Sequence, residues 1–418
     1  MFVQIHMLQS VPPGNLNRDD TGQPKKCIFG GVTRGRISSQ CLKRNIRTSN
    51  CFKQAFGEHL AVRSKYLPTL VAEALAKMPG NAIPDAEFEG IKSGLASQFK
   101  KEEKTRNDDT DEAGENAAED VTGSDTTPQL VFFKPAFASR IAELLVALKN
   151  DSPLAYKAFI GAAKKGEKLT KEQEKEAKKK IGEFIDQAAK AKESLSVDVA
   201  LFGRMTTSDI IADVEAACQV AHALSTHETL IESDYFTAMD DLRDKFAKGA
   251  GAAFLGSGDT ETFFNSAVYY KYLNLDTDGL LANLGDRDEA KAARASGVLV
   301  ESAALATPTG KQNSFAAHSV PELILVELSA RKQPISYANA FLKPVQAQDL
   351  MEGSAGALSD YCGSIAAAFS PGDTRRFLLK VGSARGFRPP EGTTVVDTLP
   401  KLVAEVEKAV KAAHEGGR

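Results

Sequence analysis

Residues 25–47 constrain the fold of this chain more than any other stretch. Three glycines between positions 30 and 35 allow tight turns and a close approach of the backbone to a ligand. Ser38 then stands where a helix N-cap is expected, because Leu42 and Ile46 follow at helical spacing. The stretch therefore predicts a glycine turn followed by a capped helix, and the free N–H groups at such a helix start form an anion site.

Basic residues gather around this turn and helix. Positions 18 to 53 carry nine basic residues and only two acidic ones, although the whole chain has a net charge of −3. The basic residues are Arg18, Lys25, Lys26, Arg34, Arg36, Lys43, Arg44, Arg47 and Lys53. A chain that is basic in one place and near neutral overall favours a specific polyanion track. Ordinary solvated charges around a capped helix are the alternative.

The rest of the pattern predicts an α+β fold. Apolar spacing gives the order strand, helix, strand, helix, strand, helix, strand, with large insertions. The expected strands cover residues 2–8, 196–205, 263–274 and 321–329. One helix is expected to follow the glycine turn and end near residue 56, and two more to cover 208–225 and 288–305. A loop is expected at 10–17. This order suits a ferredoxin-like or RRM-like sheet with helices on one face.

Three segments differ in composition from the rest. Residues 101–128 are acidic with almost no apolar side chains, which predicts a disordered loop insertion. Residues 157–193 are rich in Lys and Glu, which is typical either of an exposed helix with many ion pairs or of a surface along a DNA backbone. Residues 226–262 are glycine-rich in part and predict a mobile arm.

Composition also bounds the kind of protein. No apolar run reaches the about 20 residues that a membrane span needs, and Met1 leads directly into an expected strand without a signal peptide. The five cysteines are odd in number and contain no CxxC pair, so they indicate neither a disulfide framework nor a zinc ribbon. We therefore expect a cytoplasmic protein without a metal or other cofactor.

A series of short segments carries a family resemblance. The segments are Ile5–Leu8, Leu16–Asp20, Ile28–Gly31, Arg36–Gln40, Leu42–Arg44, Asp198–Leu201, Gly203–Met205, Ala221–Ala223, Thr226–His227, Asp234, Phe236–Ala238, Asp240–Leu242 and Ala338–Phe341. Together they resemble the CasC family, the crRNA-binding backbone subunit of type I-E CRISPR Cascade. They follow the family's order across most of the chain.

The resemblance implies an architecture like a right hand. It would comprise a ferredoxin-like or RRM-like palm, an inserted helical finger region and a thumb-like arm. The implied divisions are a palm of residues 1–58, 196–225 and 263–345, a finger of 59–195 that contains the acidic loop, a thumb arm of 226–262, and a C-terminal palm-packing segment of 346–418.

The resemblance also implies a function in antiviral defence. Such a subunit binds crRNA without cutting it and polymerises head to tail along it, which forms the helical backbone of a complex for RNA-guided recognition of target DNA. Its implied partners are crRNA, target DNA, copies of itself and the other Cascade subunits. In such a complex, base pairing with the guide recognises the target sequence, whereas the protein recognises only the shape and backbone of the nucleic acid.

Candidate site residues follow from the basic stretch and from the resemblance. Those expected to bind RNA are Arg18, Lys25, Lys26, Arg34, Arg36, Ser38, Gln40, Lys43, Arg44, Arg47, Arg204, Met205, Lys311 and Gln312. Met205 resembles a family methionine that wedges between bases, which is a reasonable role for an apolar side chain. Lysines of the finger region are expected to bind DNA, and the candidates are Lys164, Lys165, Lys168, Lys171 and Lys175.

Two other functions compete with this interpretation. A metal-dependent RNA endonuclease on the same fold would depend on Asp240, Asp241 or His6, although a packed strand histidine is the simpler interpretation of His6. A stand-alone single-strand binder would bind RNA as a monomer. His222 and His227 are five residues apart, which does not fit the four-residue spacing of a helical zinc pair.

Residues 307–311 have part of the pattern of a phosphate-binding loop. The pattern fails because Leu305 occupies the position of the first glycine and Gln312 that of the Ser or Thr. A glycine turn that presents Lys311 and Gln312 to RNA is the interpretation that we keep.

Overall fold

The computed structural model describes residues 1–78, 85–99, 126–161, 170–191, 195–235, 261–369 and 374–416. The expected acidic loop lies almost entirely outside these residues, and so do Lys164, Lys165, Lys168, Asp240, Asp241 and most of the expected arm. In the part described, no helix has the length and apolar character that crossing a membrane would require.

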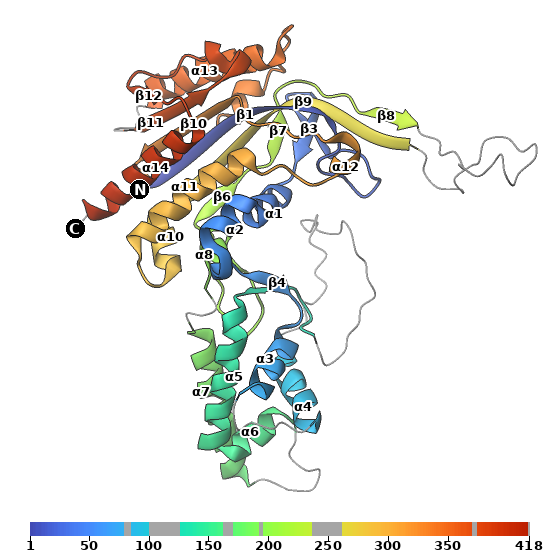
Figure 1. Ribbon diagram of the computed structural model, residues 1–418, viewed down its shortest axis with the longest axis vertical. Coiled ribbons are helices and arrows are strands. Elements are labelled where there is room, and N and C mark those ends of the chain that lie inside the picture. The colour runs from blue at the N-terminus through green and yellow to red at the C-terminus, as the bar shows by residue number, and fades with distance from the viewer. Residues whose placement is uncertain are drawn as a thin grey trace, which may run out of the picture.

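A large sheet forms the upper part of the molecule (Figure 1) and contains ten strands among the described residues. Its order is β12 (Thr393–Val395), β11 (Arg375–Lys380), β10 (Leu323–Ser329), β1 (Phe2–Gly14), β9 (Glu261–Asp276), β7 (Ala223–Ser225), β3 (Val32–Ile37) and β2 (Lys26–Phe29). β6 (Cys218–Val220) and β8 (Glu232–Tyr235) also pair with β9. Neighbouring strands are antiparallel except β11 and β12, so the fold is mixed α+β as predicted.

The central strand β1 differs from the prediction in two ways. Nearly all of its residues are buried, whereas the sequence predicted a half-buried strand, because helices cover both faces of the sheet. The strand also continues to Gly14 through the expected loop. Its register with β9 shifts between Val11 and Gly14, where Pro12 and Pro13 have no N–H to give to the ladder.

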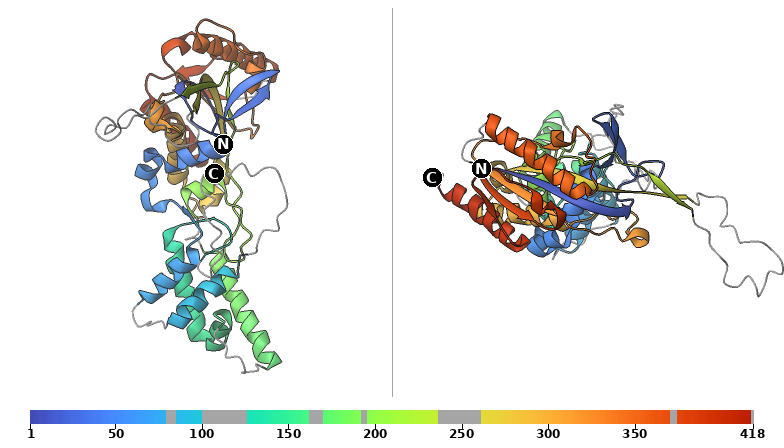
Figure 2. Two further views of the ribbon diagram at one scale, coloured as in Figure 1. Left: turned by 90° about the vertical axis from the view of Figure 1, so that its right-hand side faces the viewer. Right: turned by 90° about the horizontal axis from the view of Figure 1, so that it is seen from above.

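Helices cover both faces of the sheet rather than one (Figure 2). The first face carries α1 (Ser39–Thr48), α2 (Asn50–Phe56), α8 (Val197–Phe202), α10 (Thr277–Leu284), α11 (Glu289–Leu305) and α14 (Leu399–Glu415). The second face carries α13 (Leu350–Phe369) and the 3-10 helices η3 (Ala338–Phe341) and η4 (Gly382–Gly386). On β1, Ile5 packs into the first layer and Leu8 into the second, as strand alternation requires.

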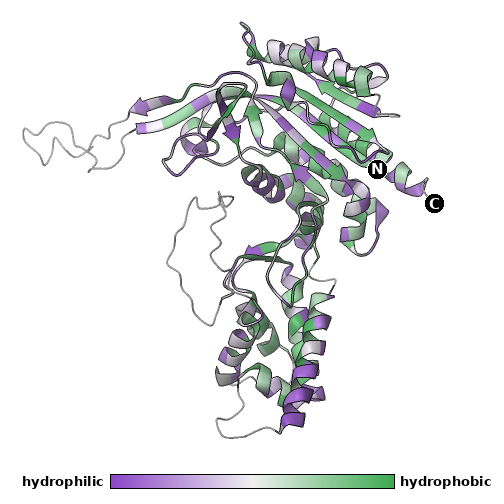
Figure 3. Cartoon of the chain, turned by 180° about the vertical axis from the view of Figure 1, so that it is seen from behind, coloured by the Kyte–Doolittle hydropathy of each residue, from purple (hydrophilic) through white to green (hydrophobic). Residues whose placement is uncertain are grey.

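A third apolar core, separate from those on the two faces of the sheet, lies below the sheet, in what we call the helical region (residues 62–191; Figure 1). It contains the ribbon of β4 (Val62–Ser64) and β5 (Val131–Phe133), and the helices α3 (Leu67–Ala76), α4 (Asp85–Ala96), α5 (Pro135–Asp151), α6 (Pro153–Phe159) and α7 (Lys171–Ala189). Figure 3 shows hydrophilic residues along much of α7, and only Ala177, Phe184 and Ala188 of this helix are buried.

Two predicted elements between residues 196 and 225 are wrong. The expected strand at 196–205 is the helix α8, because Ser196 accepts a hydrogen bond from the Val199 N–H as an N-cap and Gly203, with φ 78°, ends the helix. The expected helix at 208–225 is an irregular segment followed by β6 and β7. Both short strands pair with β9, and this pairing outweighs the helical spacing of the sequence.

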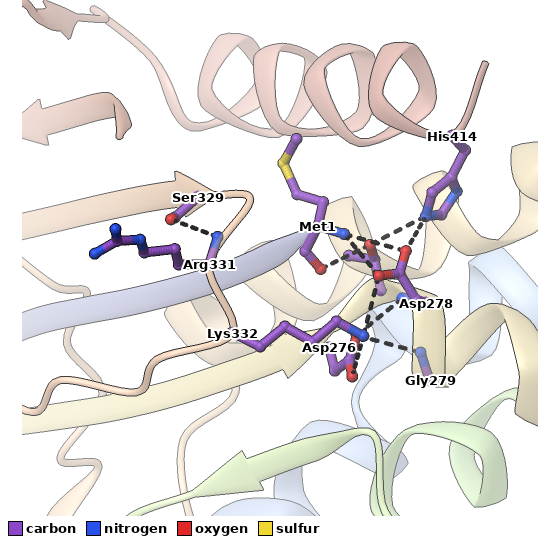
Figure 4. A network of polar contacts seen from close by, with 9 residues as sticks. Met1, Asp276, Asp278, Gly279, Ser329, Arg331, Lys332 and His414 are labelled. Atoms are coloured by element: carbon purple, nitrogen blue, oxygen red, sulfur yellow. Dashed lines mark hydrogen bonds and ion pairs between the residues drawn. The ribbon is translucent and has the colours of Figure 1, made fainter. Parts of the chain in front are cut away.

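A polar network ties the start of β1 to the ends of β9 and α14 (Figure 4). The amino group of Met1 lies 3.1 Å from Asp278, which also lies 3.0 Å from the Lys332 ammonium group and 3.6 Å from His414. Burial opposes the charge of Asp278, but the hydrogen bonds from Lys332 and the Met1 amine lower the pKa of this carboxyl group. The network therefore links the N-terminus of the sheet strand β1 to α10 and α14 of the first helical layer.

Candidate nucleic-acid interface

The loop of residues 15–25 is shaped by three side chains that the sequence analysis did not single out. Asn15 donates a hydrogen bond to the Phe263 carbonyl at 2.8 Å, and Asn17 accepts the Ser38 N–H at 2.8 Å. Asp19 accepts three hydrogen bonds from positions 21 and 23. Short amide and acid side chains at every second position are the signal that indicates such a loop. They hold the backbone that carries Arg18 and Lys25.

The predicted glycine turn is the tip of a hairpin formed by β2 and β3. Gly30 and Gly31 have φ values of 64° and 81°, the left-handed pair that a two-residue hairpin prefers. A Cβ atom on Gly30 would collide with the Leu342 carbonyl oxygen, whereas nothing lies within 4 Å of a Cβ atom on Gly31. The hairpin tip therefore packs directly on the chain after η3, through Gly30 alone.

Replacing Gly30 by Ala is expected to lower the free energy of unfolding by about 3 kcal/mol, because backbone collision adds to the cost of a left-handed alanine. Gly31→Ala carries only the conformational cost of about 1 kcal/mol. Urea denaturation of the two variants side by side measures the difference. Equal losses would contradict the close docking of the hairpin tip.

Arg34 is fully buried beneath this hairpin. Its guanidinium donates to the carbonyl oxygens of Phe29 at 3.1 Å, Ser225 at 3.0 Å and Phe341 at 2.7 Å. Burial lowers the pKa of Arg34 despite the opposing effect of Cys27 and Glu228. A guanidinium with no exposed surface cannot meet a phosphate, so the predicted RNA contact of Arg34 is replaced by a structural role.

Strand alternation divides the remaining basic residues of the hairpin between two faces. Arg36 lies on the same face of β3 as Arg34, toward η3 and α13, whereas Lys26 lies on the α1 side and is exposed. The Arg36 guanidinium lies 3.0 Å from His222 Nδ1. Because a guanidinium only donates, Nδ1 of the imidazole is the acceptor in this pair. Arg36 therefore belongs to a different surface from Lys26.

Ser38 is the N-cap of α1, as predicted. The Ser38 side chain accepts the Cys41 N–H at 3.3 Å, and its own hydroxyl hydrogen is left to donate to another group. Leu42 and Ile46 are the buried residues of the helix, which confirms the predicted spacing.

The exposed face of α1 carries Gln40 and Arg44, one turn apart, whereas Lys43 is half-buried. Burial raises the pKa of the Cys41 thiol to about 11, while Arg44 and Lys25 oppose that shift. Both cations therefore lie near this thiol. The helix and the loop of residues 15–25 bring them together from positions that are far apart in the sequence.

Arg47 links α1 to the helical region. Its guanidinium lies 3.3 Å from the Asp198 carboxylate and 3.2 Å from the Ala61 carbonyl, and it stacks over the Phe132 ring at 4.7 Å. Asp198 is itself buried and also accepts the Ala61 N–H. These contacts give the predicted RNA ligand Arg47 a structural role at the joint between the sheet and the helical region.

Arg204 and Met205 have opposite environments. Arg204 is buried and donates to the Ala212 carbonyl at 2.8 Å and to the Phe132 carbonyl at 3.0 Å. Burial lowers its pKa to about 10 despite the opposing effect of Asp213. Met205 is 89% exposed. Arg204 thus holds the loop in place rather than meeting a phosphate, and the loop projects an apolar side chain into solvent.

The short helix α12 (Gln312–Phe315) lies against the loop of residues 15–25. A Cβ atom on Gly310 would lie 2.6 Å from the Leu16 carbonyl oxygen, so the two loops pack backbone to backbone. Lys311 is exposed and has φ 51°, a left-handed conformation that is rare outside glycine. The Gln312 side chain donates to its own loop, at the Pro308 carbonyl.

The helical region presents its own basic surface on α7. Thr170 and Gln173 form a reciprocal capping box at the start of this helix. Lys171 and Lys175 follow in the first two turns and are exposed. The other three lysines of the predicted DNA-binding set lie outside the described residues.

The geometry offers little to a nuclease in the part of the chain that the structure describes. His6 is fully buried, with Nδ1 2.8 Å from the Tyr270 hydroxyl group and Nε2 3.4 Å from Glu327. Among the described residues, no three His, Cys, Asp or Glu side chains gather in a way that would hold a metal ion. Asp240 and Asp241 are not among them.

The hairpin, α1 and α12 therefore form one candidate interface for a polyanion. Its partly or fully exposed polar side chains are Arg18, Lys25, Lys26, Gln40, Lys43, Arg44 and Lys311. All of these residues are among the candidates that the sequence predicts, and their contact with RNA stays a prediction. The sequence did not identify which arginines are buried.

Comparisons with known proteins agree with this architecture. A family model described as "CT1975-like protein" matches residues 3–405. A chain from a structure titled "CRISPR RNA-guided surveillance complex, pre-nicking" is 26% identical and superposes with a TM-score of 0.73, covering 98% of this chain and 100% of that chain. A chain from a "CRISPR RNA-guided surveillance complex" has the same fold, with 23% identity, a TM-score of 0.64 and the same two coverages. No curated protein sequence matches.

Proposed function

Because the chain belongs to the CT1975-like protein family, we propose that it is a guide-RNA-binding subunit of a CRISPR RNA-guided surveillance complex. One observation carries the proposal. A chain that superposes over 98% of its length on a member of such a complex presents exposed cations from three elements on one surface. Convergent cations on a near-neutral protein are the electrostatic footprint of a nucleic-acid backbone.

We further propose that the subunit is CasC-like and forms the repeated backbone of a type I-E Cascade. Copies would contact one another head to tail along one crRNA, a heterologous contact that produces a helical filament until other subunits cap it. The palm would be ferredoxin-like. The succession β1, α1, β7, β9, α11, β10 supports this, since it is the β-α-β-β-α-β order of that fold.

The division into palm, finger and thumb belongs to the same proposal. The apolar core of the first helical layer and that of the helical region are separate, and Arg47 and Asp198 join them. This arrangement supports a boundary between palm and finger near residues 58 and 195. The finger would steer duplex DNA through Lys171 and Lys175, which α7 exposes. Met205 would wedge between bases of the guide–target hybrid, and its exposure supports that role.

The test is to mix the purified protein with end-labelled crRNA, with and without magnesium, and to measure the mass of the complexes and the length of the RNA. We expect intact RNA in complexes whose mass rises in steps of one subunit. The double variant Lys26→Ala with Arg44→Ala should lower the salt dependence of log K by about 1.4, since each phosphate contact to a single strand contributes about 0.7. Unchanged binding by this variant would refute the interface.

The same experiment separates the competing functions. We propose that the subunit is not an enzyme, so magnesium-dependent shortening of the RNA would favour the endonuclease instead. Binding of single monomers without mass steps would favour the stand-alone binder. Only the backbone function predicts that the crRNA stays intact while the mass of the complex rises in steps of one subunit.

Lys311 offers a prediction in which stability and binding change in opposite directions. Lys311→Gly should raise the free energy of unfolding by about 1 kcal/mol, because glycine adopts the left-handed conformation without cost, and should weaken RNA binding through the lost charge. Ala316→Gly is the matched control, since Ala316 has φ 45° in the same loop and carries no charge. Urea denaturation and RNA titration of both variants measure the two effects. If both variants weakened binding alike, the charge of Lys311 would not matter.

A further inference from the structure

A cavity of about 230 Å³ opens where the first helical layer of the sheet meets the helical region. Leu195 and Leu284 are apolar residues of its lining, and its charged lining residues are Lys134, Lys291 and Asp286. Figure 1 places α10, which ends at this cavity, and α12 on opposite sides of the molecule. The cavity is therefore distant from the α12 part of the candidate RNA interface, and none of its lining residues belongs to that interface.

The charged groups of the cavity favour an anionic ligand. Lys134 precedes the first residue of α5 and is half-buried. Lys291 lies 3.0 Å from the Asp286 carboxylate, and both side chains of this pair are partly exposed. An ion pair in contact with water contributes little stabilising free energy. The Lys291 ammonium group is therefore still able to attract a second anion. The lining also contains the imidazole of His59. Two ammonium groups and one imidazole therefore face a single carboxylate.

The loop beside the cavity contains a strained basic residue. Arg287, between α10 and α11, has φ 52° and is exposed. In the described part of the chain only Arg287, Lys311 and Ala316 are non-glycine residues with positive φ. Such strain persists at sites where the surrounding structure holds a side chain for a purpose. Lys311 belongs to the candidate RNA interface. Arg287 follows Asp286 in the sequence and adds a third cation to Lys134 and Lys291.

We propose that this cavity and Arg287 bind the phosphates of a DNA strand that is not paired with the guide RNA. The proposal rests on the proposed function, since it requires a complex that opens DNA. A guide-paired strand must follow the guide along the candidate RNA interface, whereas a separated strand is free to contact other basic surfaces of the subunit. The basic groups match its phosphates, and the apolar lining accommodates its sugars.

The test uses the assembled complex, loaded with guide RNA, and target duplex DNA at several salt concentrations. The double variant Lys134→Ala with Lys291→Ala should weaken DNA binding about tenfold and lower the salt slope by about 1.4, as expected for two lost contacts to a single strand. Arg287→Gly should also weaken DNA binding, while relieving strain rather than adding it. Guide retention should change less than about twofold, since the RNA contacts lie elsewhere. Lys401→Ala with Lys411→Ala, on the exposed side of α14, removes the same charge away from the cavity.

The outcomes separate the two proposals. If the cavity variants retain guide RNA and bind DNA as tightly as the unaltered complex, the cavity site alone is overturned. The same holds if their loss of DNA affinity equals that of the α14 control. A changed subunit composition with unchanged DNA affinity would assign the cavity to an acidic protein partner and would also overturn it. Failure of the unaltered protein to retain guide RNA would instead overturn the proposed function.

Discussion

Replacing Arg34 by Met is expected to lower the free energy of unfolding by about 4 kcal/mol and to abolish RNA retention with it. The guanidinium is fully buried and donates to the carbonyls of Phe29, Ser225 and Phe341, so its loss leaves two buried acceptors and one partly buried acceptor without a charged donor. These acceptors come from β2, β7 and η3. The variant therefore separates the hairpin from the body of the sheet, and urea denaturation measures the loss.

Arg44→Met is the matched control, because Arg44 is exposed on α1 in the same stretch of sequence. Its unfolding free energy should stay within about 0.5 kcal/mol of the unaltered protein, as is usual for surface substitutions. Its RNA affinity should nevertheless fall. If the Arg34 variant were as stable as the Arg44 variant, the buried role of Arg34 would be refuted.

The contrast between these two arginines shows what the sequence is able to predict. Local rules were sufficient for the glycine turn, the Ser38 cap and the buried pair Leu42 and Ile46, because each depends on neighbours within one helical turn. They were insufficient for Arg34, whose partners lie up to 307 positions away. A basic residue in a basic stretch has the same local signature whether it meets a phosphate or a buried carbonyl.

The errors of secondary structure have a related cause. The sequence predicts a strand at 196–205, where the structure has α8, and a helix at 208–225, where it has an irregular segment followed by β6 and β7. Short apolar segments fit either period. The Ser196 cap decided the first segment, and pairing with the long strand β9 decided the second. The succession of major strands and the α+β class were predictable nevertheless, because β1, β9, α11 and β10 are long enough to give unambiguous patterns.

Glu327 lies at the centre of a buried cluster of polar side chains on the second face of the sheet, the face that carries α13. Replacing it by Gln is expected to lower the free energy of unfolding by about 3 kcal/mol at pH 7. The Arg376 guanidinium lies 2.6 Å from its carboxylate, the Tyr337 hydroxyl donates to it at 2.7 Å, and His6 lies 3.4 Å away. An amide of the same shape cannot balance the Arg376 charge. Burial alone would raise the pKa of Glu327, but His6, Tyr337 and Arg376 lower it to about 2.

The pH dependence gives this prediction its sign. A folded-state pKa of about 2, below the ordinary value of 4.5, means that the ionised carboxylate stabilises the fold at every pH above about 4.5. That stabilisation is lost progressively as the pH falls from 4.5 toward 2. The difference in unfolding free energy between the unaltered protein and Glu327→Gln should therefore be constant from pH 8 to 5 and shrink below pH 4.5. Glu352→Gln, on the exposed side of α13, removes the same charge outside the cluster, and its unfolding free energy at pH 7 should stay within about 0.5 kcal/mol of the unaltered protein. A Glu327→Gln protein as stable as the unaltered one at pH 7 would mean that the cluster does not depend on this charge.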